Sequence, residues 1–497
     1  MSQKADGYVL AIDEGTTNAK AIAVTADGRV KAKASRPLTI ETPHPGWVEQ
    51  DGGLLWQATL SVIREVIAGM DGVTPLALAI SNQRETAIGW DRSTGQPLAP
   101  AITWQCTRSA PFCEQLKKDG LEEIIRLTTG LPIAPLFSGS KMNWILANTG
   151  DGFTRAANGG ICLSTIDGWL LWNLTGGHSF FCDLSNAART QLLNLKTQAW
   201  DETMLSRFGI PAVALPQIRP SSGFFGETSG LDGVSDGIPI LSMIGDSHAA
   251  LFGHGCGKPG LIKTTYGTGS SVMGPIFHVD TIVPDVATTV AWHDGENAVY
   301  ALEGNIAHTG DAVAWMLDAT GQHAATNEEL QTIPASVEST LGVYFVPALT
   351  GLGAPYWRPE ARAAIVGMSR GTGRAHLVRA ALESIAYQIR DVIEVMKAHP
   401  DFQLETLMVD GGPTRNDWLM QFQADLLQTP VARSDTAELS AIGAAALAWR
   451  SFSRLSLADV RHMLPQHEYF QPAPDKKEQM VENYAGWKKA VSGVIGG

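Results

Sequence analysis

Two segments of this chain share one pattern: an apolar strand, a turn built on Gly-Thr, and a second strand. The first runs YVLAID, EGTTN and AKAIAVT from residue 8, and ADGR and VKAKASRPL follow it. The second runs LIKTTY, GTG and SSVMGPI over residues 261–276. Apolar alternation broken by Gly-Thr and Asp-Gly turns predicts antiparallel strands. Two such hairpins predict two related domains, each with a turn that faces a phosphate, and chance repetition of a short motif is the alternative.

The second half of the chain adds helices between strands. Residues 375–397, 416–427 and 440–449 have helical periodicity or small apolar composition, and Asn416 is a suitable N-cap. The segment VDGGPTRN predicts a strand that ends at Gly411-Gly412. Alternating strands and helices predict α/β architecture, in which ligands bind beyond the carboxyl ends of strands.

Composition excludes several classes of protein. The formal charge of −13 over 497 residues argues against a nucleic-acid partner, which would require a basic surface. No apolar run long enough to span a membrane occurs, and MSQKADGYVLAID does not match a signal peptide, so we expect a cytoplasmic protein. The five cysteines have no paired spacing and are expected to be reduced, buried thiols: Cys106, Cys113, Cys162, Cys182 and Cys256.

One apparent nucleotide motif is excluded by its context. Residues 255–260, GCGKPG, fit G-x-G-x-x-G, but they follow a predicted helix and precede a strand, the reverse of a dinucleotide site. The chain contains neither a P-loop nor the protein-kinase motifs. Any phosphate-binding apparatus must therefore be of another type.

Two aspartates end predicted strands. Asp13 lies directly before Gly15-Thr16-Thr17, where phosphates would repel its carboxylate unless Mg²⁺ lay between them. The alternative is an aspartate that caps its own turn. Asp246 ends IPILSMIGD, and there it could accept the proton of an attacking hydroxyl or simply cap the following helix.

A polar loop, residues 82–86 (NQRET), lies between the apolar segments LALAIS and AIGW. Arg84 could donate to hydroxyl oxygens and Glu85 could accept from hydroxyl protons, a combination that suits vicinal diols. A surface salt bridge is the alternative. Trp104 could place its ring against the carbon side of a polyol, or it could be part of the core.

With these motifs, the chain resembles the FGGY carbohydrate kinases, and it is most similar to their glycerol kinase branch. The resemblance runs nearly end to end, through PGWVEQD, SNQRET, TWQCTR, FSGSKMNWIL, NAARTQLLN, GDSHAALFG, TYGTG, LEGNIAHTG, VPALTGLGAPYWRP and VDGGPTRNDWLMQFQADLL. It implies two ribonuclease H-like domains of the actin/hexokinase type with a nucleotide cleft between them. We expect residues 1–255 to hold the polyol site and the first phosphate hairpin, and residues 256–497 to hold the second hairpin and the adenosine site.

The resemblance also implies residue roles. Asp13 falls at the family's metal-associated aspartate, and Asp246 falls at its catalytic base. Nucleotide binding is implied for Thr16, Thr17, Lys20, Thr268, Gly310, Gly411, Gly412 and Asn416. Polyol binding is implied for Arg84, Glu85, Trp104 and Asp246, and for three positions at which this chain departs from glycerol kinase: Leu136, Ser247 and Ser271.

These departures make the predicted acceptor pocket roomier. Leu136 replaces a tyrosine, Ser247 a glutamine and Ser271 a phenylalanine, while Lys20 replaces an arginine of the phosphate loop and loses its bidentate fork. The preferred acceptor is therefore expected to be longer than glycerol, such as a four- or five-carbon polyol. A further departure concerns regulation. Some bacterial members of the glycerol kinase branch bind a sugar bisphosphate effector through an arginine before an Ile-Pro-Ile strand, where this chain has SDGIPI with Asp236 and Gly237. An aspartate would repel a phosphate, so we expect no inhibition by fructose 1,6-bisphosphate.

The expected reaction is transfer of the γ-phosphate of ATP, with Mg²⁺, to a terminal hydroxyl of glycerol or a related short polyol, giving glycerol 3-phosphate and ADP in the case of glycerol. Alternatives are a kinase for erythritol, threitol, a pentitol or a ketopentose, and an actin-like nucleotide switch without a small substrate. The expected partners are the polyol and ATP, without nucleic acid or a membrane span, and the expected assembly is a homo-oligomer, a dimer or a tetramer.

Overall fold

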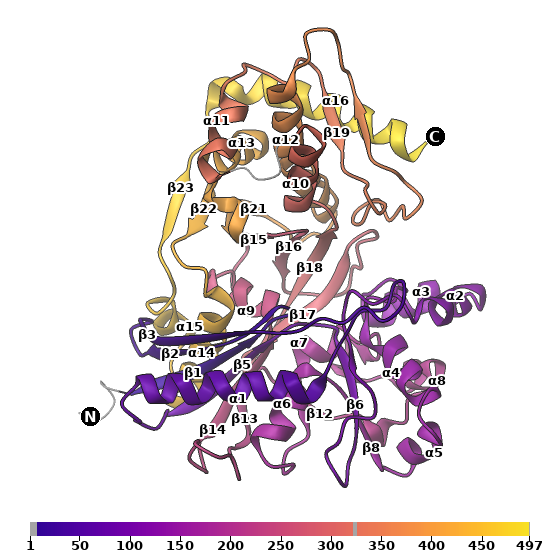
Figure 1. Ribbon diagram of the computed structural model, residues 1–497, viewed down its shortest axis with the longest axis vertical. Coiled ribbons are helices and arrows are strands. Elements are labelled where there is room, and N and C mark those ends of the chain that lie inside the picture. Colours follow the sequence, from indigo (N-terminus) through magenta and orange to yellow (C-terminus); the bar gives the residue numbers. More distant parts are fainter. Residues whose placement is uncertain (1–6, 322–325, 497) are drawn as a thin grey trace. The chain divides into compact units, whose positions relative to one another are not determined.

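The computed structural model describes residues 7–321 and 326–496, so the first six residues of the segment tested for a signal peptide lie outside the described part. The chain forms two compact units (Figure 1). Among the described residues, unit 1 holds those up to Gly255 together with Thr288–Tyr300 and Glu438–Pro465, and unit 2 holds the rest. Two segments beyond residue 255 therefore fold with the first part of the chain.

Unit 1 is built on a six-stranded sheet in the order β13-β14-β5-β1-β2-β3. The predicted N-terminal hairpin is confirmed, because β1 and β2 are antiparallel and β3 continues the meander. β5 lies parallel to β1, and β14 lies parallel to β5. The bounds are β1 Tyr8–Glu14, β2 Asn18–Thr25, β3 Val30–Pro37, β5 Ala77–Asn82, β13 Ser222–Glu227 and β14 Pro239–Gly245.

Helices cover this sheet because its central strands are apolar on both faces. α1 (Gly52–Gly69) starts at its N-cap Asp51 and lies across β1, β2 and β3 (Figure 1). Its buried face joins Leu10 and Ile12 of β1 in one core cluster. α14 (Leu439–Ser453), predicted as residues 440–449, packs against β5, β14 and β1.

A second core of unit 1 lies against the four-stranded sheet β4-β7-β6-β8. Its strands are β4 Glu49–Gln50, β6 Ala87–Asp91, β7 Ala101–Ile102 and β8 Ile161–Thr165. Two short two-stranded sheets follow: β12 Gln217–Arg219 with β9 Phe181–Asp183, and β10 Leu193–Asn194 with β11 Ala199–Trp200. The helices are α2 Ala110–Lys118, α3 Glu122–Thr129, α4 Ser138–Ala147, α5 Gly152–Ala157, α6 Ile166–Leu174, α7 Leu184–Ala187, α8 Glu202–Phe208, α9 Asp246–Gly253 and α15 Leu457–Arg461.

Unit 2 carries the sheet order β18-β16-β15-β21-β22-β23. The second predicted hairpin is confirmed as antiparallel β15 and β16, and β21 lies parallel to β15. The bounds are β15 Gly260–Tyr266, β16 Ser270–Ile276, β18 Ala298–Ile306, β21 Leu404–Asp410, β22 Val431–Ser434 and β23 His467–Phe470. β17 (Ala287–His293) and the first residues of β18 belong largely to unit 1.

The helices of unit 2 include both of the longer predicted ones. Residues 375–397 appear as α12 (Arg374–Met396), and residues 416–427 appear as α13 (Asp417–Leu427), whose N-cap is Asn416 as predicted. The others are α10 Gly310–Ala319, α11 Asn327–Ala335 and α16 Lys477–Ile495, and β19 Tyr344–Val346 pairs with β20 Ala364–Val366.

The two sheets repeat one topology. In each, a strand forms an antiparallel hairpin on one side and pairs in parallel with a later strand on the other: β2-β1-β5 in unit 1 and β16-β15-β21 in unit 2. The likeness of the two Gly-Thr hairpins is therefore structural, because each occupies the same place in its own sheet. The rejected motif at residues 255–260 does lie between helix α9 and strand β15.

Two further expectations concern cysteines and membranes. All five cysteines are free and buried, as predicted. Within residues 7–321 and 326–496, none of the helices combines the length and the apolarity that a membrane crossing requires.

Candidate active site

Three adjacent parallel strands of unit 1 end together and place the predicted chemistry at one sheet edge. β1 ends in Asp13 and Glu14, β5 ends in Asn82 just before Arg84, and β14 ends in Gly245 just before Asp246. The register pairs Glu14 with Asn82 and Gly245 with Asn82. Carboxyl ends of parallel strands are the usual ligand-binding edge of α/β sheets. The pairing thus brings together residues that are far apart in the sequence.

Asp13 is partly buried and lies in a charged environment. Its carboxylate accepts a hydrogen bond of 3.0 Å from the Ser81 hydroxyl on β5, so it does not simply cap its own turn. Burial raises the pKa of Asp13 to about 6, the Asp246 carboxylate adds to the rise, and Lys20, directly opposite on β2, lowers it. A carboxylate that is costly to ionise beside a second carboxylate fits a divalent cation, which would relieve both effects.

Asp246 is the first residue of α9, and Gly245 is the N-cap residue. The interpretation of Asp246 as a helix cap is therefore wrong. Its Oδ1 atom lies 3.3 Å from Nε of Arg84 and accepts a 2.6 Å hydrogen bond from the backbone N–H of Ser247. The side chain of Asp246 is 37% exposed whereas that of Arg84 is 9% exposed. A buried guanidinium thus orients a carboxylate that solvent and a small ligand can reach.

Glu85 is buried, so the interpretation of the Arg84-Glu85 pair as a surface salt bridge is wrong. Its Oε1 atom lies 2.5 Å from Nε of Arg189, a fully buried arginine. Its backbone has φ of 61°, an unusual conformation for a residue other than glycine. Its carbonyl oxygen accepts from the Ser138 hydroxyl and the Lys141 ammonium, both at 3.0 Å. Arg189 thus holds the carboxylate of Glu85, and Ser138 and Lys141 hold its backbone.

Trp104 lies at the surface rather than in the core, with 39% of its area exposed. Its indole N–H donates to the Thr16 hydroxyl over 2.9 Å, and its backbone N–H donates to the Thr86 hydroxyl over 3.2 Å. Thr17 in the same turn is exposed. Trp104 therefore joins the predicted phosphate turn, through its indole, to the predicted polyol loop, through its backbone, while part of its area stays exposed.

The other predicted unit 1 residues border this edge. Lys20 lies opposite Asp13, and its ammonium is 3.5 Å from Glu438. Leu136 is half-buried, and its carbonyl accepts a 2.5 Å hydrogen bond from Lys141. Ser247 is half-buried beside Asp246. Lys141, which the sequence reasoning missed, therefore bridges the backbones of two predicted substrate residues, Glu85 and Leu136.

The predicted unit 2 residues cluster around the turn between β15 and β16. Thr268 is exposed at its tip, and its carbonyl accepts from the Thr309 N–H over 3.0 Å. The Gly310 N–H donates to the Gly267 carbonyl over 3.0 Å, and a Cβ at Gly310 would lie 2.5 Å from that oxygen. The Ser271 hydroxyl donates to the buried Glu303 carboxylate over 3.0 Å.

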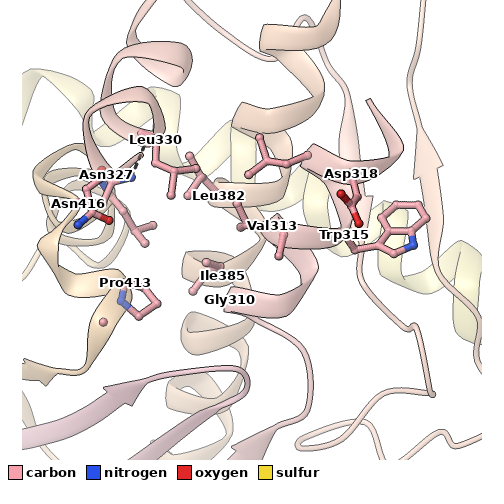
Figure 2. Close-up of a pocket in the computed structure, with 14 residues that line it drawn as sticks. Gly310, Val313, Trp315, Asp318, Asn327, Leu330, Leu382, Ile385, Pro413 and Asn416 are labelled. Carbon is pink, nitrogen blue, oxygen red and sulfur yellow. Dashed lines mark hydrogen bonds between the residues drawn. The ribbon is translucent and has the colours of Figure 1, made fainter. Parts of the chain in front are cut away.

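A cavity of about 480 Å³ opens beside this turn within unit 2. Gly310, Gly412 and Asn416 line it. Its apolar wall consists of Val313, Leu330, Leu382 and Ile385 (Figure 2). Gly411, also predicted, has φ of 98°, and a Cβ there would lie 1.9 Å from the Tyr266 carbonyl. The volume and the mixed lining suit a flat heteroaromatic ring with a few polar edges.

Asn416 is fixed in this cavity by its helix. Its Oδ1 atom accepts from the Leu419 N–H over 3.0 Å, and its Nδ2 donates to the Leu330 carbonyl over 2.8 Å. Trp315, on the far side of the cavity in Figure 2, stacks on Phe345. The cavity walls are therefore preformed.

Gln83 is a second residue whose importance the sequence did not reveal. Its buried amide donates to the carboxylate of Glu14 over 3.1 Å and to the side chain of Gln50 over 2.8 Å, and it accepts from Thr86 over 2.8 Å. Gln50 in turn donates to the Thr16 carbonyl over 2.9 Å. Gln83 lies in the polar loop of residues 82–86, but no local feature of the sequence indicates which groups it contacts.

Comparison with known proteins agrees with this geometry. The N-terminal domain model of the FGGY family of carbohydrate kinases matches residues 8–253, and the C-terminal domain model matches residues 262–452. An apulose kinase of Pectobacterium atrosepticum is 45% identical over 487 residues, covering 97% of each chain. Glycerol kinase 2 of Thermotoga maritima is 43% identical over 501 residues, covering 98% of this chain and 99% of the relative.

Solved structures are similar over the same length. A Plasmodium falciparum glycerol kinase with ADP has a TM-score of 0.92 at 31% identity, with 98% of each chain covered. A ligand-bound xylulose kinase of Lactobacillus acidophilus has a TM-score of 0.89 at 20% identity, which shows a common fold. With both domain models matched in order and relatives similar from end to end, the chain belongs to the FGGY family of carbohydrate kinases, two-domain α/β enzymes that phosphorylate polyols or sugars.

Proposed function

We propose that this kinase transfers the γ-phosphate of ATP to a terminal hydroxyl of a short polyol or ketose, with Asp246 as general base. The observation that carries the proposal is the meeting of Asp13, Arg84 and Asp246 at the ends of β1, β5 and β14. At this sheet edge the buried guanidinium of Arg84 orients the accessible carboxylate of Asp246, and the carboxylate of Asp13 interacts with that of Asp246. Phosphoryl transfer requires mainly such positioning and charge stabilisation.

The acceptor is proposed to bind through unit 1. Arg84 donates to one hydroxyl oxygen, Glu85 accepts from a hydroxyl proton, and Trp104 offers an apolar ring face to the carbon chain. Asp246, with its accessible carboxylate, accepts the proton of the attacking hydroxyl. Because Arg189 and Lys141 already fix Glu85, little order has to be imposed when the acceptor binds.

The nucleotide is proposed to bind through Thr16, Thr17 and Lys20 in unit 1 and through Thr268 and the cavity lined by Gly310, Gly412 and Asn416 in unit 2. Gly411 keeps the adjoining backbone close to Tyr266. Asp13 is the residue that would hold Mg²⁺, directly or through water, because its carboxylate is partly buried beside a like charge. The ion would neutralise charge on the phosphate oxygens.

An acceptor of four or five carbons is favoured over glycerol itself. Leu136 lacks the hydroxyl of the tyrosine that it replaces, and the Ser271 hydroxyl donates to Glu303. Both side chains are also smaller than the tyrosine and phenylalanine of glycerol kinase. The similarity to an apulose kinase supports this choice, and glycerol is the second candidate. A cytoplasmic location and a dimeric or tetrameric state remain predictions.

A coupled assay of ADP release tests the proposal. Glycerol, erythritol, threitol, the pentitols, xylulose, ribulose and apulose would each be offered at several concentrations with Mg-ATP, and kcat/KM would be compared. We expect acceptor-dependent ADP release that is highest for a four- or five-carbon compound. A higher kcat/KM for glycerol than for all of the others would overturn the acceptor proposal, and ADP release independent of every acceptor would overturn the kinase assignment of the site.

A further inference from the structure

A short buried segment of unit 1, Asp183–Arg189, contacts each of the strand ends that carry the proposed acceptor residues. The segment comprises Asp183, helix α7, its C-cap residue Ala188 and Arg189, and its sequence is DLSNAAR. Asp183, Ser185, Asn186 and Arg189 are all 0% exposed. Polar side chains that are fully buried are costly unless each has a defined partner, so their contacts show what the segment does.

Ser185 holds the end of β14. Its hydroxyl oxygen accepts a 3.0 Å hydrogen bond from the backbone N–H of Gly245, the residue directly before Asp246. Gly245 is the last residue of β14 and the N-cap residue of α9, so its peptide sets the direction in which Asp246 leaves the sheet. The Ser185 hydroxyl therefore fixes the backbone from which the proposed base projects.

Asn186 holds the end of β5. Its side-chain amide and that of Asn82 exchange two hydrogen bonds of 3.0 Å each. Asn82 also donates to the Gln83 carbonyl over 2.8 Å, immediately before Arg84. A reciprocal amide pair permits one relative orientation of its two residues, and it therefore fixes the path of the loop that carries Arg84.

Arg189 holds Glu85. Its Nε atom lies 2.5 Å from the Glu85 carboxylate, and its guanidinium lies over the Phe137 ring at 5.1 Å. The segment thus contacts the end of β14 through Ser185, Asn82 before the Arg84 loop through Asn186, and the Glu85 carboxylate through Arg189.

Asp183 orders the segment itself. Its Oδ2 atom accepts from the Ser185 N–H at 2.9 Å and the Ser221 hydroxyl at 2.6 Å. Its Oδ1 atom accepts from the N–H and the side-chain amide of Asn186 at 3.0 and 2.8 Å. One carboxylate therefore fixes the two residues that contact β14 and β5, and the order of the segment does not depend on a ligand.

We propose that Ser185, Asn186 and Arg189 are positioning residues that set the relative placement of Asp246, Arg84 and Glu85. The proposal rests on the function proposed above, because it assumes that these three residues receive the acceptor. Misplacement of a reacting group by about 1 Å can cost roughly 100-fold in rate, so a second layer of contacts of this kind is functionally important.

The test is steady-state kinetics of Ser185→Ala, Asn186→Ala, Arg189→Met and Arg189→Lys, with the best acceptor from the screen. We expect kcat/KM for the acceptor to fall about 10- to 100-fold in the first three variants, while KM for ATP stays within about twofold. Arg189→Lys should recover part of the loss relative to Arg189→Met, because it keeps a cation beside Glu85. A loss of folded protein alone would lower kcat without changing KM for the acceptor.

Ser242→Ala is the matched control. Ser242 is also a fully buried serine, on β14 itself, but its hydroxyl donates to the Ala444 carbonyl, and it should leave both KM values unchanged. Wild-type kinetics in Ser185→Ala and Asn186→Ala, together with an inactive Asp246→Asn, would overturn the positioning proposal and leave the proposed function intact. Near-full activity of Asp246→Asn would instead overturn the proposed function. If Asn186→Ala yields no folded protein, Ser185→Ala, which removes a single oxygen, decides the question.

Discussion

Nε of Arg84 lies 3.3 Å from Oδ1 of Asp246, across two parallel strands whose ends are separated by about 160 residues of sequence. The arginine is almost fully buried and the aspartate is accessible, so the cation orients a base that still reaches a ligand. Loss of the carboxylate charge should therefore remove proton acceptance without disturbing the sheet.

Asp246→Asn should fold and bind ATP but transfer phosphate about 100- to 10,000-fold more slowly, because general-base catalysis contributes roughly that much to the rate. The asparagine Oδ1 can still accept from the Ser247 N–H, so α9 should start as in the wild type. The measurements are acceptor-dependent ADP release and calorimetric titration with ATP. Retention of more than about a tenth of wild-type kcat would exclude Asp246 as the base.

Trp104 should contribute in two separable ways. Trp104→Ala loses both the ring face and the hydrogen bond to Thr16, and it should raise KM for the acceptor about 10-fold or more. Trp104→Phe keeps a ring but loses the indole N–H, so it should affect KM for ATP more than KM for the acceptor. Parallel titration of both substrates in each variant provides the comparison, and identical profiles for the two variants would contradict the separation.

Asp13 should lower stability at neutral pH. Its pKa is raised from 3.8 to about 6 in the folded protein. The free energy of unfolding is therefore highest below pH 3.8, where Asp13 is protonated in both states, and it falls as the pH rises through 6 and the buried carboxyl must ionise. A rise of about two pKa units corresponds to at most about 3 kcal/mol, and partial exposure reduces this to about 1–2 kcal/mol.

Asp13→Asn should therefore unfold at a higher temperature than the wild type at pH 7.5 without Mg²⁺, and the difference should shrink toward pH 5. Differential scanning calorimetry at both pH values makes the comparison. The same variant should be inactive with Mg-ATP. A lower melting temperature for Asp13→Asn than for the wild type at pH 7.5 would show that the raised pKa does not govern stability.

Asn416 should affect nucleotide binding independently of helix stability. Asn416→Ala loses the N-cap and should cost about 1 kcal/mol in the free energy of unfolding. Asn416→Asp loses the amide that donates to the Leu330 carbonyl. Because it keeps an oxygen that can accept from the Leu419 N–H, its free energy of unfolding should be closer to that of the wild type. Both should raise KM for ATP several-fold and leave KM for the acceptor unchanged, and denaturant unfolding with kinetics separates the two effects.

Fructose 1,6-bisphosphate should not inhibit this kinase. Asp236 and Glu227 line an open hollow of about 620 Å³ in unit 1. Two carboxylates repel a phosphate rather than bind it. Activity measured with and without millimolar effector should be the same, and clear inhibition would mean that the effector binds elsewhere.

The sequence was sufficient for the local features of both units. Apolar alternation and Gly-Thr turns predicted both hairpins, helical period predicted α12 and α13, and the Asn416 cap followed from its place before an apolar periodic run. The ordered blocks that match the FGGY family predicted the reaction class. These features depend on neighbouring residues, so a local pattern is enough to reveal them.

The tertiary structure decided which side chains meet. The contacts of Arg84 with Asp246, of Glu85 with Arg189 and of Trp104 with Thr16 join segments about 90 to 160 residues apart. The first contact exists because β5 and β14 are neighbouring parallel strands. The other two depend on where helix α7 and strand β7 place Arg189 and Trp104. A linear pattern gives the period and the turns of each strand but not its neighbour in the sheet. The positions of Lys141, Gln83 and the Asp183–Arg189 segment therefore emerged only once the chain was folded.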